Sequence, residues 1–296
     1  MEITKREHAV IEYCRLSYRA DALAEFGNEY ELALLLKESC TVAKKAGHDD
    51  YCLFFKAEQA HYIDKDNRKA IQLLSEGIAW AEEQNLPGDA FLLKNIGIYY
   101  SILGDGEAAI EWFDKALAAN PEDYHTMRQK GVSLSRKGDE DAAIELFDKA
   151  LGINPKDYHA LREKGVSLSK KGDVDASIEW FDKALAINPE DYHAMRAKGI
   201  SLSKKGDEDA AIDWYDKALV VNPIDYRSLR HKGVSLSEIG EVDASIELFD
   251  KVLAVNPEDY HALREKGVSL YKKGYEDASI ELFDKALAIN PEDYHA

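Results

Sequence analysis

The sequence has few cysteines and no long apolar run. In the sequence of 296 residues, no apolar run approaches the roughly 18 consecutive residues that a membrane span needs. The segment from Met1 to Glu7 is charged with no apolar stretch behind it, so no secretory signal is expected. The three cysteines, Cys14, Cys40 and Cys52, form no CxxC pair. We expect them to be small buried thiols in a reducing, cytoplasmic compartment.

Positive charge is also scarce. Lysine and arginine number 38 against 56 aspartates and glutamates, which gives a net charge of −18. Such a balance repels nucleic acid and anionic membrane on average, so neither is expected as a partner. A content of 45% hydrophobic and 32% charged residues is typical of a folded, soluble chain and excludes a disordered one.

Motifs that mark catalytic or cofactor sites are absent. The sequence has no GxSxG, no HExxH, no P-loop and no dinucleotide-binding glycine pattern. Acidic runs such as 207–209 recur with the helix starts, where carboxylates favour the helix dipole. In the N-terminal third, His8, His48, His61 and Cys14 have no recognisable spacing. We therefore predict no enzyme activity, no catalytic residues, no metal and no cofactor.

What the sequence does have is an internal repeat of 34 residues. One glycine and one proline recur at that interval: Gly97, Gly131, Gly165, Gly199, Gly233 and Gly267; Pro121, Pro155, Pro189, Pro223, Pro257 and Pro291. Six repeats fit this frame over residues 90–293: 90–123, 124–157, 158–191, 192–225, 226–259 and 260–293.

Each repeat is predicted to be two helices. In 124–157, apolar residues at spacings of three and four mark two helical faces. The glycine at 138 ends the first helix and the aspartate at 139 caps the second. Pro155 ends the second helix, because proline disfavours helix in the residue before it. We expect Gly131 to let the two helices approach closely against Ala143, with Phe147 filling the gap to the next hairpin.

These residues resemble the tetratricopeptide repeat family. Counted from the first residue of each repeat, position 4 is large and apolar, 8 is Gly, 20 is small, 24 is aromatic, 27 is small and 32 is Pro; repeat 90–123 has Leu93, Gly97, Ala109, Phe113, Ala116 and Pro121. One departure is a lysine at position 7, which is usually apolar in the family. The resemblance implies an all-α fold, a right-handed superhelical solenoid of antiparallel helix hairpins, with first helices lining a concave groove.

Residues 1–89 lack the strict period but still indicate helices, at 4–24, 29–46, 50–63 and 67–85. Ala70, Leu74 and Gly77 repeat the spacing of positions 20, 24 and 27, and Pro87 corresponds to the proline that ends each repeat. We interpret this region as two degenerate hairpins that continue the solenoid, with a separate small helical domain as the alternative. Residues 294–296 begin a further repeat. The last hairpin is therefore expected to expose apolar surface around Leu282, Ala286 and Ile289.

Two other periodic columns need no ligand. Histidines at position 2 belong to neighbouring helices on the order of 10 Å apart, too far for two ligands of one zinc ion. The members are His125, His159, His193, His261 and His295, with Arg227 replacing one. Tryptophans at position 23 (Trp112, Trp180 and Trp214) alternate with leucine, which indicates packing.

The resemblance implies that positions 2, 5, 9, 12 and 13 face the groove. Position 5 is basic throughout: Lys94, Arg128, Arg162, Arg196, Arg230 and Arg264. Position 9 is apolar (Val132, Val166, Ile200, Val234), position 12 is mostly serine (Ser135, Ser169, Ser203) and position 13 is basic in four of six repeats (Arg136, Lys170, Lys204, Lys272). Because arginine binds carboxylates through two parallel hydrogen bonds, we expect an acidic peptide segment with interspersed apolar residues, extended or helical.

Two alternatives remain open from the sequence. The arginines could instead pair with acids of their own or the next repeat, such as Glu163 or Glu265, which would mute the basic column. The chain could also be a self-assembling structural protein, a homo-oligomer that stacks through its exposed C-terminal end.

Overall fold

The computed structural model describes residues 2–25, 28–84 and 89–291, and these residues form helices without any strand. They fall into two compact bodies, Met1–Ile153 and Asn154–Ala296. The N-terminal body contains α1 (Glu2–Glu25), α2 (Glu29–Lys45), α3 (Asp49–Tyr62), α4 (Asn67–Glu83), α5 (Ala90–Ile102), α6 (Gly106–Ala119), α7 (Tyr124–Lys137) and α8 (Glu140–Ile153). The C-terminal body contains α9 (Tyr158–Lys171), α10 (Val174–Ile187), α11 (Tyr192–Lys204), α12 (Glu208–Val221), α13 (Tyr226–Glu238), α14 (Val242–Val255), α15 (Tyr260–Lys272) and α16 (Glu276–Ile289).

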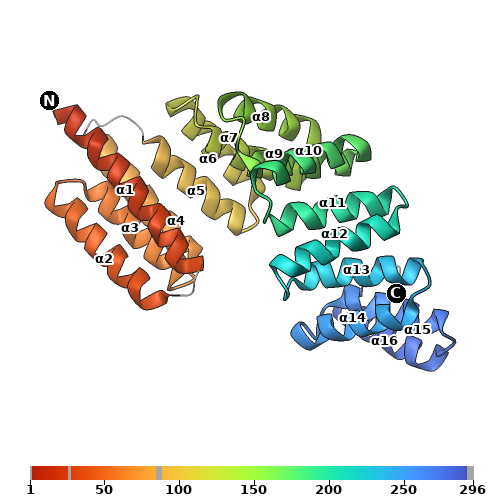
Figure 1. The fold of residues 1–296 in the computed structure, drawn as a ribbon. Coiled ribbons are helices and arrows are strands. Elements are labelled where there is room, and N and C mark those ends of the chain that lie inside the picture. Colours follow the sequence, from red (N-terminus) through yellow and green to blue (C-terminus); the bar gives the residue numbers. More distant parts are fainter. Residues whose placement is uncertain (1, 26–27, 85–88, 292–296) are drawn as a thin grey trace. The chain divides into compact units, whose positions relative to one another are not determined.

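Local sequence sets the helix boundaries. The aspartate before each first helix accepts backbone N–H bonds from the first turn, as Asp191 does from His193 and Ala194. Gly138 and Gly172 end α7 and α9 in the left-handed conformation, with φ of 89° and 91°. These are the stop and start signals that the sequence predicts, and they place each 34-residue repeat as one hairpin (Figure 1).

The close approach inside each hairpin is different from the predicted one. A Cβ added at Gly131 would lie 2.7 Å from Cε1 of Phe147, so the aromatic ring of the second helix covers this glycine. The atoms nearest to Gly131 are therefore those of Phe147, and the expectation that Ala143 is its partner is wrong. That Phe147 also fills the gap to the next hairpin stays a prediction. The same contact recurs between Gly165 and Phe181, also at 2.7 Å. Glycine is therefore required at this position, because the aromatic ring of the second helix occupies the space that a Cβ would need.

First and second helices occupy different layers. In the C-terminal body α9 contacts α11, α11 contacts α13 and α13 contacts α15, whereas no comparable contact joins the described parts of successive second helices. First helices therefore lie closer together and form the inner layer. The fold class is the predicted one, an all-α, right-handed superhelical solenoid of antiparallel helix hairpins.

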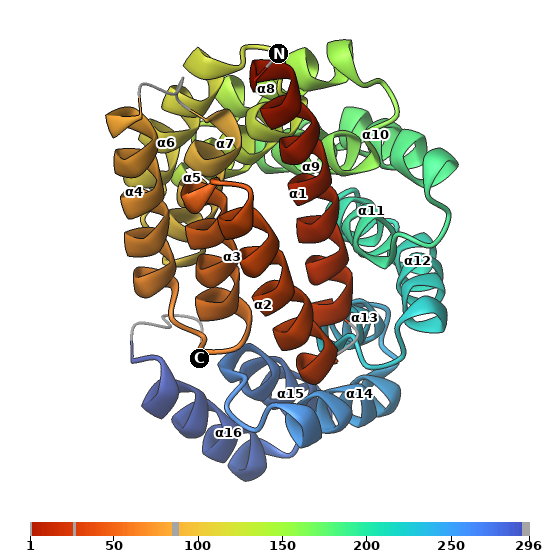
Figure 2. The same ribbon diagram turned by 90° about the vertical axis from the view of Figure 1, so that its left-hand side faces the viewer.

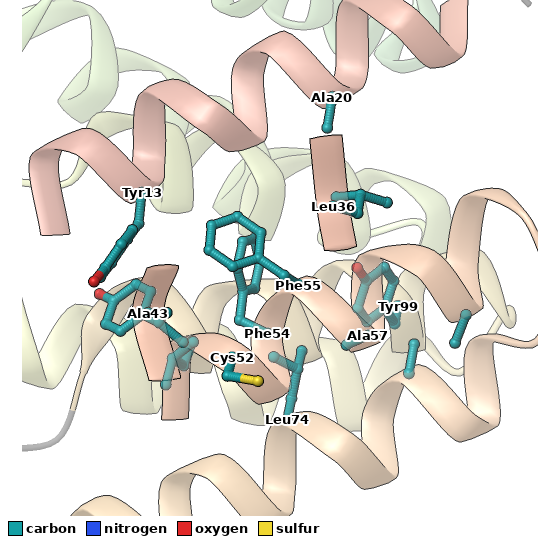
Figure 3. Packing of buried hydrophobic residues seen from close by; sticks show 14 of the residues in the cluster. Tyr13, Ala20, Leu36, Ala43, Cys52, Phe54, Phe55, Ala57, Leu74 and Tyr99 are labelled. Atoms are coloured by element: carbon teal, nitrogen blue, oxygen red, sulfur yellow. The ribbon is translucent and has the colours of Figure 1, made fainter. Parts of the chain in front are cut away.

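The N-terminal helices agree with the predicted ranges to within two residues at each end that is described. Figure 2 shows α1, α2 and α3 side by side, and all three are in contact. Figure 3 shows their shared core, in which Tyr13, Phe54, Leu74 and Tyr99 come from α1, α3, α4 and α5. This core is continuous with the first 34-residue repeat. The reading of α1–α4 as two degenerate repeats remains an interpretation.

Two cysteines differ from the expectation. Cys40 of α2 and Cys52 of α3 are joined in a disulfide, so the prediction of separate thiols is wrong for this pair. The two cysteines belong to different helices and share no cysteine motif, but they meet because α2 packs directly on α3. The side chain of Cys14 lies outside the described part of the chain.

The last hairpin exposes a different apolar residue from the predicted set. Ala286 is fully buried, and Leu282 is half-buried. Ile289 is exposed, but so are the equivalent residues Ile187 and Val255 of inner repeats. Ile280 is 56% exposed, whereas the equivalent Ile178 and Ile246 of inner repeats are half-buried. Residues 294–296 lie outside the described part. None of the described helices is long and apolar enough to cross a membrane.

Candidate functional site

The predicted groove residues lie on one face of the first helices. On α9 the half-buried or exposed residues His159, Arg162, Val166 and Lys170 are three or four positions apart, and they alternate with buried residues that pack inside the array. The position-9 residues are half-buried in every repeat: Ile98, Val132, Val166, Ile200, Val234 and Val268. Among the serines, Ser135 and Ser169 are buried and Ser203 is half-buried. Each body therefore presents an apolar stripe on its inner layer, flanked by cations.

The position-5 cations bind the aspartate that begins the next first helix. Within the C-terminal body the shortest N–O distances are 2.8 Å for Arg162–Asp191, 2.6 Å for Arg196–Asp225 and 3.2 Å for Arg230–Asp259. Lys94 and Asp123 form the corresponding 3.6 Å pair in the N-terminal body. These cations connect successive hairpins, and each partner also caps a helix.

Two of the shared aspartates, Asp225 and Asp123, are held in their ionised form. Burial alone would raise the pKa of Asp225, but hydrogen bonds from Ser228 and Arg196 outweigh it and hold the pKa below its usual range. The pKa of Asp123 is lowered in the same way. Burial alone would raise it, but the charge of Lys94 and a hydrogen bond from Thr126 outweigh burial. The basic column is thus largely compensated at neutral pH, as one alternative from the sequence anticipated.

The second contact of each arginine depends on position 6. Where position 6 is glutamate, the guanidinium bonds to it, with distances of 3.0 Å for Arg162–Glu163 and 2.7 Å for Arg264–Glu265. Where position 6 is Ala197, Nη2 of Arg196 instead lies 3.1 Å from Nδ1 of His193. Arginine only donates, so this nitrogen of His193 accepts and the neutral ring carries its proton on Nε2.

The position-13 lysines tie first helices together. Nζ of Lys204 donates to the carbonyl oxygen of Ser169 at 3.0 Å and to its hydroxyl at 3.1 Å. Lys272 makes the same two bonds to Ser237. Both ammonium groups stay at the surface of the inner layer, so they bind the neighbouring hairpin and still face solvent.

The position-7 lysines are structural residues whose role the sequence analysis missed. They pair with an aspartate of the preceding second helix, at 2.5 Å for Lys232–Asp216 and for Lys266–Asp250, and Lys198 pairs with Asp182 in the same way. The signal was available, because lysine and aspartate recur together with a constant separation of 16 residues. This pairing explains why lysine replaces the family's apolar residue.

The tryptophans and histidines are engaged within the array. The ring of Trp180 lies between the ammonium groups of Lys164 and Lys183, each 3.8 Å from the centroid. His159 and His193 each pack on the preceding tyrosine, with ring centroids 4.0 Å apart. Among the described residues no three His, Cys, Asp or Glu side chains are grouped to hold a metal ion.

The histidines of the N-terminal third are not brought together. His48 lies 3.0 Å from the hydroxyl of Tyr13, and His61 lies 2.5 Å from Oδ1 of Asn67. The two rings therefore belong to separate hydrogen-bonded pairs. His8 and Cys14 have no described side chain.

Comparison with known sequences agrees with this architecture. The pattern of the tetratricopeptide repeat matches residues 128–192, 162–225 and 232–294, and a second pattern of the same description matches residues 95–123. These matches cover more than half of the sequence. The chain belongs to the tetratricopeptide repeat family. No curated protein sequence matches it.

Solved structures share the fold. The APC/C hetero-tetramer Cut9-Hcn1 has a TM-score of 0.74 at 17% identity, over 94% of this chain and 53% of that one. PilW, a type IV pilus biogenesis factor, has a TM-score of 0.64 at 21% identity, over 70% and 96%. PilF of Pseudomonas aeruginosa has a TM-score of 0.60 at 15% identity, over 70% and 94%. At these identities the likeness concerns the fold alone.

Proposed function

We propose that this chain is a protein-interaction scaffold that binds a peptide segment, acidic with interspersed apolar residues, along the inner face of its first helices. The observation that carries the proposal is the half-buried apolar stripe of Val166, Ile200 and Val234, bordered by guanidinium and ammonium groups. An apolar stripe supplies burial for side chains of the ligand, and flanking cations favour carboxylates.

The arginines retain donors for such a ligand. Arg196 uses Nη1 for Asp225 and Nη2 for His193, and a guanidinium has five N–H donors in total. The remaining N–H groups can bind a ligand carboxylate without breaking the contact between hairpins. Because the paired aspartates cancel much of the charge, the apolar stripe contributes most of the affinity and the cations select among ligands.

The test uses the apolar stripe, since replacing an arginine by glutamate would put a second carboxylate beside a buried aspartate. The triple variant V166S/I200S/V234S and the wild type are probed with arrays of random acidic, neutral and basic peptides. The wild type is expected to bind acidic–apolar peptides, and the triple variant to lose them. The matched control I187S/V255S makes the same change on exposed second-helix sites.

Circular dichroism and thermal melting establish that the variants are folded. If the triple variant binds the same peptides as the wild type, the inner face is not the site. If the wild type prefers basic peptides, the acidic specificity is wrong.

A second candidate is self-assembly through the end of the array. The exposed Ile280 favours it, because the equivalent Ile178 and Ile246 of inner repeats are half-buried. Light scattering against protein concentration tests it. Self-assembly predicts a mass that rises with concentration and falls to the monomer value in I280E; a constant wild-type mass would exclude it.

A further inference from the structure

The segment 220–227 departs from an otherwise closely repeated sequence. At position 29 the other repeats have alanine or glycine (Ala118, Gly152, Ala186, Ala254, Ala288), but this one has Val220. At position 33 the other described repeats have a charged residue (Glu122, Lys156, Glu190, Glu258), but this one has Ile224. Arg227 replaces the histidine of position 2 in the following helix. Three substitutions thus fall together in one short segment.

The two aliphatic side chains point into solvent. Val220 is 82% exposed and Ile224 is 76% exposed; among the described residues, Tyr30 is the one other large hydrophobic side chain exposed to this degree. Val221, which follows the apolar pattern of position 30, lies beside them and is also exposed. Val220, Val221 and Ile224 are thus three exposed aliphatic residues within five positions at the end of α12, and we call them the α12 patch.

The fold does not require these residues. The backbone N–H of Ile224 donates to Oδ1 of Asn222, and Glu190 and Glu258 make the same bond to Asn188 and Asn256 in their own repeats. The turn is therefore equivalent whichever side chain occupies position 33. At position 220 valine is a poorer helix former than the alanine of neighbouring repeats. Both changes run against local stability and solubility.

The charge around the α12 patch is more positive than at the equivalent place in the neighbouring repeats. Ile224 removes the carboxylate that Glu190 and Glu258 supply elsewhere, and Arg227 adds a permanent cation. Arg227 is exposed, and its Nε donates to the hydroxyl of Tyr226 at 3.3 Å; within the described ranges no hydrogen bond joins it to a carboxylate. In a chain of net charge −18, this is a local apolar surface beside a cation.

We infer that the α12 patch, together with Arg227, is a second docking surface for a protein segment that presents apolar side chains next to a carboxylate. Val220, Val221 and Ile224 bury the apolar side chains, and the guanidinium of Arg227 binds the carboxylate. The α12 patch lies on a second helix and its following turn, whereas Arg227 is at position 2 of the first helix α13, so this surface adjoins the inner face at that position.

The test uses the repeats as their own controls. A random peptide display library is selected on the full chain, with counter-selection on V220A/I224E/R227H, which restores the residues that other repeats use. We expect the surviving peptides to combine a carboxylate with apolar residues. They should bind the reverted chain about tenfold more weakly or worse, because apolar burial is lost. The reverted chain should fold normally, as circular dichroism will report.

A graft gives the converse measurement. The variant A254V/E258I/H261R rebuilds the patch one repeat later, beside Val255, and is expected to bind two copies of a selected peptide by calorimetry. The inference is overturned if no peptide distinguishes wild type from the reverted chain, or if the graft leaves the stoichiometry at one. It is also overturned if the wild type self-associates and the reverted chain does not, because the occupant would then be a second copy.

Discussion

At the scale of single residues, Glu58 is a carboxyl group buried in the core of the N-terminal body. It is 3% exposed, and its Oε1 accepts a hydrogen bond from the hydroxyl of Tyr99. Burial, with the nearby charge of Asp21, raises its pKa from 4.5 to about 8. The carboxyl group is therefore largely neutral when α1, α3 and α5 are packed together at neutral pH.

This burial makes the stability of the N-terminal body depend on pH. The folded pKa lies above the unfolded one, so the folded state retains a proton that the unfolded state releases between pH 4.5 and 8. Stability is full below pH 4.5 and falls as the pH rises to about 8. Glu58→Gln, which stays neutral, should remove this decline and gain on the order of a few kcal/mol at the alkaline end.

Urea unfolding at both ends of that pH range measures the effect of Glu58→Gln. The exposed Glu76→Gln on α4 is the control and should change little at either pH. An equal effect of Glu58→Gln at low and high pH would show that the carboxyl group is not protonated in the folded chain.

The glycines supply a second residue-level prediction. Gly165→Ala places a Cβ 2.7 Å from the buried ring of Phe181 and should destabilise the C-terminal body by about 1–3 kcal/mol. Gly152→Ala lies in α8 with no heavy atom within 4 Å of the new Cβ and should stabilise its helix by about 0.5–1 kcal/mol. Thermal unfolding of the two variants should therefore shift in opposite directions, and a shift of the same sign would contradict the packing described.

At the scale of helices, successive hairpins are joined by repeated ion pairs. Position 5 pairs with the next capping aspartate, position 7 with an aspartate of the preceding second helix, and position 14 with the start of that helix, as Lys205 does with Asp175 at 2.7 Å. The first kind is shielded from water and the last is not. The buried ion pairs of position 5 should therefore have larger coupling energies than the exposed ion pairs of position 14.

A double-mutant cycle measures this difference. The side chains of Arg196 and Asp225 are 12% and 8% exposed, and we expect Arg196→Met with Asp225→Asn to give a coupling energy of about 1–3 kcal/mol. Asparagine keeps the helix cap. Lys205 and Asp175 are 54% and 76% exposed, and Lys205→Met with Asp175→Asn should give a clearly smaller coupling energy, because solvent screens this pair. Equal coupling in the two cycles would mean that the buried pair does not join the hairpins as described.

At the scale of the whole molecule, a solenoid transmits stability only between neighbours. The Cys40–Cys52 bond joins α2 to α3 near one end of the array. Reduction restores the freedom of a short loop in the unfolded chain, worth about 2–3 kcal/mol in the chain-entropy view. We expect faster hydrogen exchange in α1–α3 on reduction and no change in α9–α16. The variant Cys40→Ser with Cys52→Ser should behave like the reduced chain, and accelerated exchange throughout would contradict nearest-neighbour behaviour.

The hairpin architecture could be predicted because its determinants are local. A capping aspartate, an ending glycine, a terminating proline and two apolar faces lie within each 34 residues, so the period of the sequence is the period of the fold. The candidate site was predicted as a set of positions, which helical spacing places on one face of each first helix; that this face binds a ligand stays a prediction. The ion pairs of Arg162 and Arg196 could not be predicted from the sequence. Whether such a cation contacts a ligand or an aspartate depends on the rotation between successive hairpins.

Local signals in the chain were enough for the helices, their pairing and the repeated layers, because each depends on residues a few positions apart. Only the folded molecule decided that Phe147 rather than Ala143 covers Gly131, that Cys40 meets Cys52, and that the position-5 cations bind capping aspartates. Each of these contacts joins residues from different helices, and its geometry follows from how whole helices are offset and rotated. Sequence spacing alone carries no measure of that offset.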